Sequence, residues 1–219
     1  MNDDKELSSV SNITEIQYSA LQKAYTFFNK RLFDGKLVDV LITFNRKRHV
    51  AGYFCRNSFM LRKNEQALHE ISLNPDTFIK ERTVERILST LVHEQAHLWQ
   101  YQYGKRKSRN GYHNREWADK MEEIGLMPST TGEEGGSRTG QSCSHYIIEE
   151  GPFYWDCADF LMCTDALLFL SLPVFTVRTD SKKKNKIAYR CPSCGQKAWA
   201  KPHARLMCGN CEEVMNQED

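Results

Sequence analysis

The sequence predicts an α+β protein with a small cysteine-rich module at its C-terminal end. Two observations predict this class. Segments with apolar residues at helical spacing occur together with short, β-branched segments over residues 13–127. Two C-x-x-C pairs then follow near the end of the chain. We therefore expect one folded core and one appended module within the 219 residues.

The first part of the core is predicted to be one helix followed by three strands. Residues 1–12 are polar and are expected to be disordered. Apolar residues recur at helical spacing from Ile16 to Phe28, and Gly35 suits the left-handed turn beyond such a helix. Three segments with strand character come next, at 38–44, 51–54 and 69–73.

Two further helices and a less regular region complete this part of the chain. Helical patterns over residues 83–101 and 113–124 are joined by a basic loop at 105–111. Residues 128–145 are rich in Ser, Thr and Gly without periodicity, so we expect a linker there. An aromatic and apolar segment, 146–180, connects the linker to the module at 181–219; a buried helix over 159–172 is one interpretation of part of it.

His93, Glu94 and His97 form the pattern H-E-x-x-H within the first of these helices. Residues four apart on a helix share one face, so the two imidazoles can bind one ion. Glu94 projects to the side, where it can take a proton from a water on that metal and later deliver it to a leaving amine. The pattern predicts a zinc metallopeptidase with Glu94 as its catalytic residue. Two satisfied, half-buried histidines are the alternative.

A third ligand is expected because catalytic zinc sites usually have three protein ligands and one open position. Among seven histidines, His113 is best placed, since it begins the helix that carries Trp117 and can fold back across the basic loop. The alternative for His113 is a solvent-exposed side chain. His145 is the second candidate, although it lies in the expected linker. Three others are interpreted as strand or module residues: His49, His69 and His203.

A second zinc site is predicted in the C-terminal module. Its ligands are Cys191, Cys194, Cys208 and Cys211, two C-x-x-C pairs separated by thirteen residues. Each pair can aim two thiolates at one ion, and two pairs complete a closed tetrahedron. With no open position, this zinc is expected to be structural. A redox function of the pairs is the alternative. The remaining cysteines lack such spacing and are expected to be free: Cys55, Cys143, Cys157 and Cys163.

The module is also basic, with no acidic residue between Lys182 and Cys211. The basic residues are Lys182, Lys183, Lys184, Lys186, Arg190, Lys197, Lys201 and Arg205. Tyr189 and Trp199 lie among them. A basic surface with exposed aromatic rings suits phosphates and unpaired bases, so DNA, single-stranded or junction-containing, is an expected partner. The alternative is a solvated hairpin that only supports the fold. The net charge of +2 is too small to argue for nucleic acid, so the argument for DNA depends on the local distribution of charge.

Five motifs occur in order over residues 14–127. They are the segments 33–37, 51–54, 70–75, 85–97 and 111–117. In this order they resemble the SprT-like (Spartan) family of zinc metallopeptidases. The resemblance implies a minigluzincin-like core with helices packed on a small mixed β-sheet, zinc on His93, His97 and His113, and Glu94 as general base. It also implies a C-terminal zinc ribbon that engages DNA, and a cleft lined by the strand near Ile71, where the substrate adds as an extended strand.

The sequence also bears on location and function. The polar start and the lack of a long apolar segment predict no secretory signal and no membrane partner, hence a cytoplasmic protein, at the nucleoid in bacteria or in the nucleus in eukaryotes. The oligomeric state is not indicated. The leading hypothesis is a zinc metalloendopeptidase that cleaves DNA-bound or DNA-crosslinked proteins. The alternatives are a nucleic-acid-binding zinc protein with an inactive peptidase centre, and a peptidase restricted to one protein partner.

Overall fold

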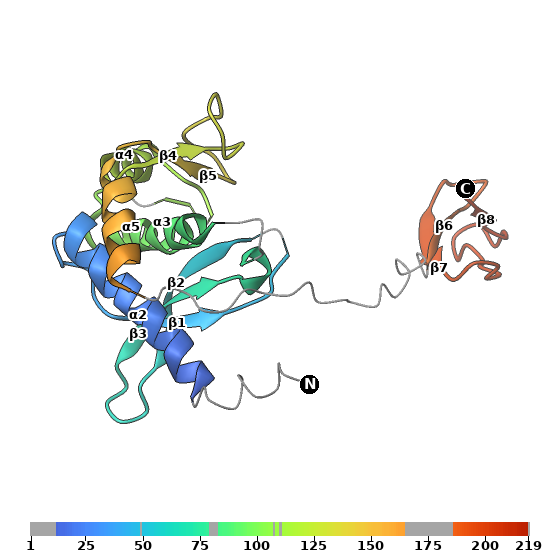
Figure 1. The fold of residues 1–219 in the computed structure, drawn as a ribbon. Helices are drawn as coiled ribbons and strands as arrows, with labels where there is room; N and C mark the ends of the chain where they lie inside the picture. The colour runs from blue at the N-terminus through green and yellow to red at the C-terminus, as the bar shows by residue number, and fades with distance from the viewer. Residues whose placement is uncertain are drawn as a thin grey trace, which may run out of the picture. The chain divides into compact units, whose positions relative to one another are not determined.

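The chain folds into two compact units, Met1–Pro173 and Val174–Asp219 (Figure 1). Each unit has its own hydrophobic core. The computed structural model describes residues 12–48, 50–78, 83–106, 108–109, 111–164 and 186–218. We call the described parts of the two units the core unit and the C-terminal module. The expected disorder at 1–11, His49, most of the helix considered over 159–172, and Lys182 to Lys184 lie outside the described residues.

The core unit contains helices and strands in mixed order, which confirms the α+β prediction. Its elements are α2 (Ile13–Leu32), β1 (Val40–Phe44), β2 (Gly52–Met60), β3 (Ala67–Leu73), the 3₁₀ turn η1 (Pro75–Thr77), α3 (Val84–Tyr103), α4 (Arg115–Glu123), β4 (Leu126–Ser129), β5 (Ser144–Ile147) and α5 (Pro152–Cys163). The three strands and three helices expected up to residue 124 are all present, with β2 longer than its pattern indicated.

The main sheet has the order β1-β3-β2, with β1 parallel and β2 antiparallel to β3. Ile71 of β3 therefore lies between Ile42 and Phe54. Because strands on both sides use the hydrogen-bonding edges of β3, no further strand can add to it. A substrate chain in the cleft expected near Ile71 therefore cannot pair with β3 itself; the outer strands of this sheet are β1 and β2.

Helix α3 is the central element of the core unit. Every residue from Ile87 to Ala96 is buried, and this stretch is long enough to include all faces of the helix. The sheet, α2, α4 and α5 all contact α3. On the α2 side, the ring of Phe28 stacks on Phe153 of α5 with centroids 5.4 Å apart. A helix covered on all sides buries its polar residues too, and this places the H-E-x-x-H pattern inside the protein.

Residues 128–145 do not form the expected linker. Strand β4 pairs antiparallel with β5, from Leu126 opposite Ile147 to Ser129 opposite Ser144. The chain between them folds into hydrogen-bonded turns, and Arg138 forms ion pairs with Asp119 and Glu122 of α4. Ser, Thr and Gly are typical of such turns as well as of linkers, which explains why composition alone was misleading.

The C-terminal module is a small antiparallel sheet around the cysteines. Its strands β6 (Ile187–Arg190), β7 (Lys197–Ala200) and β8 (Asn216–Gln217) have the order β7-β6-β8. The buried core consists of Tyr189, Cys191, Cys208 and Met215. A core of so few apolar side chains cannot stabilise a fold alone. A metal bound by the cysteines would supply the missing free energy of folding.

None of the helices in the described part of the chain combines the length and apolar character needed to cross a bilayer.

Candidate metal centres

His93, His97 and His113 converge on one point of the core unit. Their ligand nitrogens all lie within 4.8 Å of one another, and Nε2 of His97 is 3.1 Å from Nε2 of His113. Tetrahedral zinc with bonds of about 2.0–2.1 Å holds its ligand nitrogens roughly 3.4 Å apart. The three side chains are therefore spaced to share one ion with little movement.

His113 reaches this point from a segment that precedes α4 rather than from the helix itself. Its backbone forms an isolated bridge with Gly140, with N–H···O distances of 2.8 and 3.1 Å. Asn114 then caps α4 by accepting a hydrogen bond from the N–H of Trp117. The Nδ1 of His113 lies 3.3 Å from the Gly140 carbonyl. Donation to that oxygen puts the proton on Nδ1 and leaves Nε2 free for a metal.

Trp117 forms the floor beneath the three imidazoles. The indole is fully buried, stacks on His97 at 15° with centroids 5.0 Å apart, and lies 4.4 Å from the His113 ring. Burial lowers the pKa of His97 to about 3, helped by the nearby His113, and burial together with the other imidazoles lowers the pKa of His93 well below its usual value. The rings are thus neutral at physiological pH, the form that binds metals.

Glu94 lies beside the histidines and against strand β2. Burial raises its pKa to about 8 in the metal-free protein, partly opposed by the N–H of Phe54, which donates to the carboxylate. A Cβ on Gly52 would lie 3.1 Å from Glu94 Oε1. The outer strand β2 therefore runs directly past the carboxylate, and a neighbouring cation would return this group to its ionised form.

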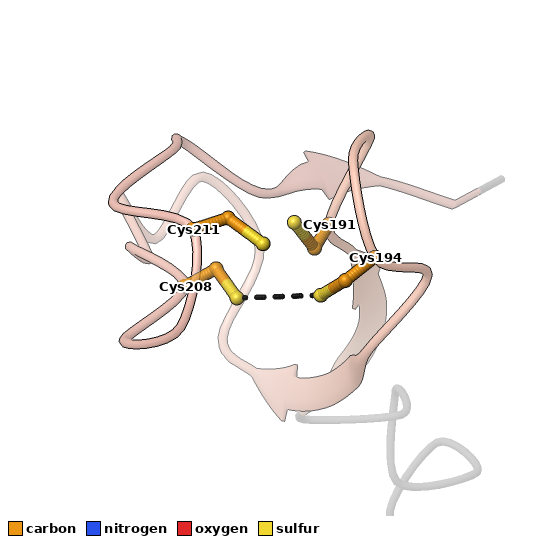
Figure 2. Close-up of side chains that lie close together, drawn as sticks. All are labelled: Cys191, Cys194, Cys208 and Cys211. Carbon is orange, nitrogen blue, oxygen red and sulfur yellow. Dashed lines mark hydrogen bonds between the residues drawn. The ribbon is translucent and has the colours of Figure 1, made fainter.

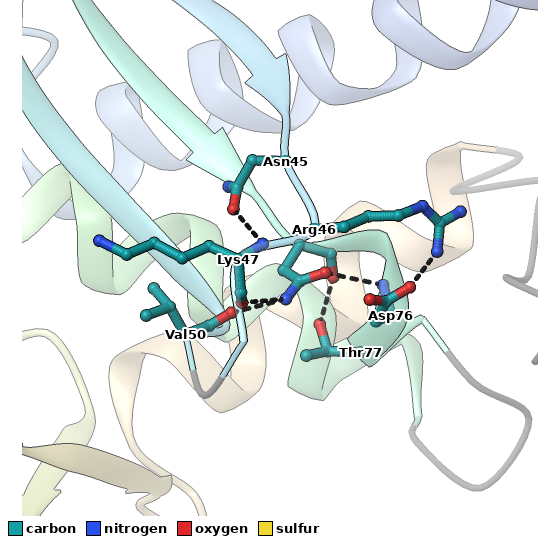
Figure 3. Close-up of polar contacts among 7 residues, drawn as sticks. Asn45, Arg46, Lys47, Val50, Asp76 and Thr77 are labelled. Carbon is teal, nitrogen blue, oxygen red and sulfur yellow. Dashed lines mark hydrogen bonds and ion pairs between the residues drawn. The ribbon is translucent and has the colours of Figure 1, made fainter. Parts of the chain in front are cut away.

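The beginning of β2 is fixed by Asn74, which forms hydrogen bonds with Lys47, Val50, Asp76 and Thr77, four residues labelled in Figure 3. Its Nδ2 donates to the carbonyls of Lys47 and Val50 at 2.9 and 2.8 Å, and its backbone N–H donates to Ala51. The 3₁₀ turn η1 is held to the same residue, because the N–H of Asp76 donates a hydrogen bond to Asn74 Oδ1. This network holds the loop before Gly52, and hence the position of β2 beside Glu94.

His145, the second candidate for the third ligand, is not a member of the histidine group. It lies buried on β5, with Nδ1 3.1 Å from Nδ1 of His93 and Nε2 2.8 Å from Ser89 Oγ. It thus contacts a predicted ligand from behind. Sequence reasoning missed this contact because it depends on the pairing of β4 and β5, for which the sequence carried no signal.

The four module cysteines also converge on one point (Figure 2). Their sulfur atoms lie within 4.8 Å of one another, and Cys194 Sγ is 3.6 Å from Cys208 Sγ. Zinc–sulfur bonds of about 2.3 Å place sulfurs roughly 3.8 Å apart. Two matching turns present them: Gly195 N–H donates to Cys191 O, and Glu212 N–H donates to Cys208 O.

The electrostatics of this cluster favour a cation. The N–H groups of Asn210 and Cys211 lower the pKa of Cys208 to about 7, whereas the hydrogen bond with Cys194 raises the pKa of Cys211 to about 12. One thiolate thus opposes ionisation of the next, and a divalent cation removes that conflict. No other group of three or more possible ligands occurs among the residues that the structure describes.

The basic surface of the module is smaller than the sequence indicates. Tyr189 is buried, with 2% of its surface exposed, and its hydroxyl donates to Lys201 O and accepts from Ala204 N–H. It is therefore not available to stack on a base, because its ring forms the core of the module. Trp199 is 63% exposed. Glu218 lies beyond the segment from Lys182 to Cys211, which has no acidic residue, and it forms ion pairs with Arg190 and Lys197.

Comparison with known proteins agrees with this geometry. A sequence model described as the SprT-like family matches residues 21–134, more than half of the chain. The chain is also similar to a Salmonella typhimurium protein named "Uncharacterized protein in mucB 3'region", with 39% identity over 54 residues, which cover 25% of this chain and 73% of that protein. The segment 21–134, which the family model matches, contains His93, Glu94, His97 and His113. The chain belongs to the SprT-like family.

Proposed function

We propose that this protein is a zinc-dependent metalloendopeptidase in which His93, His97 and His113 hold the metal and Glu94 is the catalytic base. The observation that carries the proposal is the convergence of three neutral imidazoles beside a buried carboxylate. Three ligands leave a fourth tetrahedral position open, as catalysis requires and a purely structural site does not. Family membership supports a metallopeptidase-type domain.

The chemistry follows from the position of Glu94. A zinc ion bound to the three histidines supplies Lewis acidity, which polarises a substrate carbonyl and makes water acidic near neutral pH. Glu94 accepts a proton from the water that attacks the amide carbon. It then delivers this proton to the amide nitrogen, the C–N bond breaks, and a carboxylic acid and an amine leave. Trp117 keeps the imidazoles aligned throughout, because its buried ring packs against all three.

The substrate chain is proposed to add to the outer edge of β2. Backbone groups of a strand point alternately to its two edges. Ala51 O points toward Asn74 at the end of β3, whereas the N–H of Phe54 points to Glu94. An extended peptide on that outer edge would pass next to the base and be held by its backbone, which suits a peptidase that tolerates many sequences.

The four cysteines are proposed to hold a second, structural zinc. Their sulfurs lie within 4.8 Å of one another, and four thiolates leave no open position for chemistry. The resulting zinc ribbon would keep Trp199 exposed on its sheet, with the exposed basic residues Lys186, Lys201 and Arg205 in the same module.

We further propose that the zinc ribbon engages single-stranded or junction-containing DNA and that the peptidase cleaves proteins bound or crosslinked to it. An exposed indole among cations supports base stacking and phosphate contacts. Such substrates would place the protein at the bacterial nucleoid or in the nucleus.

The experiment is cleavage of a core histone by the zinc-loaded protein, with and without single-stranded DNA, beside the variant His113→Ala. Cleavage by the wild type with DNA, and none by the variant, is expected. DNA-independent cleavage would instead indicate a peptidase restricted to a protein partner. DNA binding without cleavage by either protein would indicate a nucleic-acid-binding protein with an inactive centre, and would overturn the proposed activity.

A further inference from the structure

We propose that His145 is a positioning residue for the metal ligand His93 and that Ser89 in turn positions His145. The inference rests on the proposed zinc site and deepens it. His93 Nδ1 and His145 Nδ1 are 3.1 Å apart, His145 Nε2 is 2.8 Å from Ser89 Oγ, and Ser89 Oγ is 2.9 Å from Arg86 O. These contacts form one continuous chain from the metal ligand to a backbone carbonyl of α3.

The positions of the protons follow from this chain. A hydrogen bond between two Nδ1 atoms requires one to donate and the other to accept. If His93 Nδ1 carries the proton, its Nε2 lone pair is free for the metal, and His145 accepts on Nδ1. Neutral His145 then carries its proton on Nε2 and donates it to Ser89 Oγ. The Ser89 hydroxyl proton remains for Arg86 O, so each of the three contacts has one donor and one acceptor.

The reverse arrangement disagrees with the geometry. If His145 donated to His93 Nδ1, neutral His93 would carry its proton on Nε2, where a metal must bind. Ser89 would then have to donate its single proton to His145 Nε2, and its 2.9 Å contact with the Arg86 carbonyl would have no proton. Only the first arrangement uses all three contacts and leaves His93 able to bind metal.

The surroundings make this chain suitable for orienting a ligand. His145 is 4% exposed and Ser89 is fully buried. His145 lies on β5, and the pairing of β5 with β4 places His145 opposite Pro128. Ser89 lies on α3, one helical turn before His93. A buried partner on the far nitrogen of a ligating histidine fixes the tautomer and the ring orientation, and loss of such a partner typically costs about 10–100-fold in metal affinity.

The test measures the zinc dissociation constant of the core-unit site by competition with a chelator. Titration of His113→Ala supplies the contribution of the cysteine site alone. His145→Leu removes the acceptor, whereas His145→Asn keeps an amide oxygen near the position of Nδ1. Ser89→Ala removes only the far contact, and His69→Leu is the control for losing an imidazole elsewhere in the core unit. Thermal unfolding of each metal-free variant is measured in parallel.

We expect zinc affinity to fall about 10–100-fold in His145→Leu, to fall less in Ser89→Ala, and to recover largely in His145→Asn. His69→Leu should bind zinc like the wild type. Equal affinities for His145→Leu and the wild type would overturn the inference, and so would equal losses in the Leu and Asn variants, which would show packing alone. A wild type without zinc at the histidines would instead overturn the proposed function, so the two failures are distinguishable.

Discussion

Gly52 of β2 lies against Glu94 of α3 so closely that a side chain at residue 52 would meet the proposed catalytic carboxylate. A Cβ built there lies 3.1 Å from Glu94 Oε1, 3.1 Å from Ser72 O and 3.2 Å from Thr90 Cγ2. The backbone of Gly52 has no positive φ. Glycine is therefore needed for space, and the strand approaches the helix only because residue 52 has no side chain.

Gly52→Ala is expected to lower both peptidase activity and stability. The added methyl must push β2 or Glu94 outward, and overpacking of this kind typically costs about 1–3 kcal/mol. A displacement of the base by even about 1 Å is expected to reduce kcat around 100-fold. Gly209→Ala is the matched control, since nothing lies within 4 Å of its Cβ position. Wild-type kcat in Gly52→Ala would show that β2 does not constrain the base.

Cys208→Ser is expected to remove one zinc per chain and to unfold the C-terminal module alone. Three thiolates and a hydroxyl bind zinc poorly, and the small core of the module is not expected to fold without metal. The core unit has its own hydrophobic core and should keep its metal. Metal analysis and limited proteolysis check this, with the exposed Cys163→Ser as control. Loss of both metals in Cys208→Ser would contradict independent sites.

Metal-free protein is expected to lose stability as the pH falls below about 6.5. The folded state lowers the pKa of His97 to about 3, whereas the unfolded chain takes up a proton near pH 6.5. Between these values the unfolded state binds more protons, so the free energy of unfolding decreases with falling pH. Urea midpoints at pH 7, 6, 5 and 4 measure the effect. His97→Gln should show a shallower dependence, and identical slopes would contradict it.

Trp199→Ala is expected to bind single-stranded DNA about 5-fold or more weakly than the wild type does, since stacking contributes about 1–3 kcal/mol per base. Trp155→Ala is the matched control, because this indole is also exposed but lies on α5 of the core unit. Fluorescence anisotropy with labelled single-stranded DNA at fixed salt provides the measurement. Equal affinities of the two variants would argue that the module does not stack on bases.

The histidine and cysteine groups were predictable from the sequence because each depends on local spacing. His93 and His97 are one helical turn apart, and each C-x-x-C pair needs only a tight turn. The helix of His93 was predictable for the same reason, since its apolar positions repeat at helical period. His113 was predicted near the metal, although it lies in a bridge before α4 rather than in the helix.

Contacts between segments distant in sequence were not predictable in the same way. The Ser, Thr and Gly of residues 128–145 suited a linker, but Ser129 and His145 are buried because β4 pairs with β5. The central place of Ile71 depends on which strands flank β3, and short strand patterns carry no signal for sheet order. Tyr189 was expected on the surface because its basic neighbours indicated an exposed segment. Side chains alternate between the two faces of a strand, and the ring of Tyr189 lies on the buried face.

The most direct test of the central claim compares Glu94→Gln with the wild type, both loaded with zinc. Gln has nearly the same shape as Glu but cannot accept the proton, so the variant should bind as much zinc as the wild type. Cleavage of the histone substrate should fall about 100–10,000-fold. Glu134→Gln, an exposed change in the turn after β4, should cleave normally. Unchanged cleavage by Glu94→Gln with full zinc content would contradict the role of Glu94 as the catalytic base.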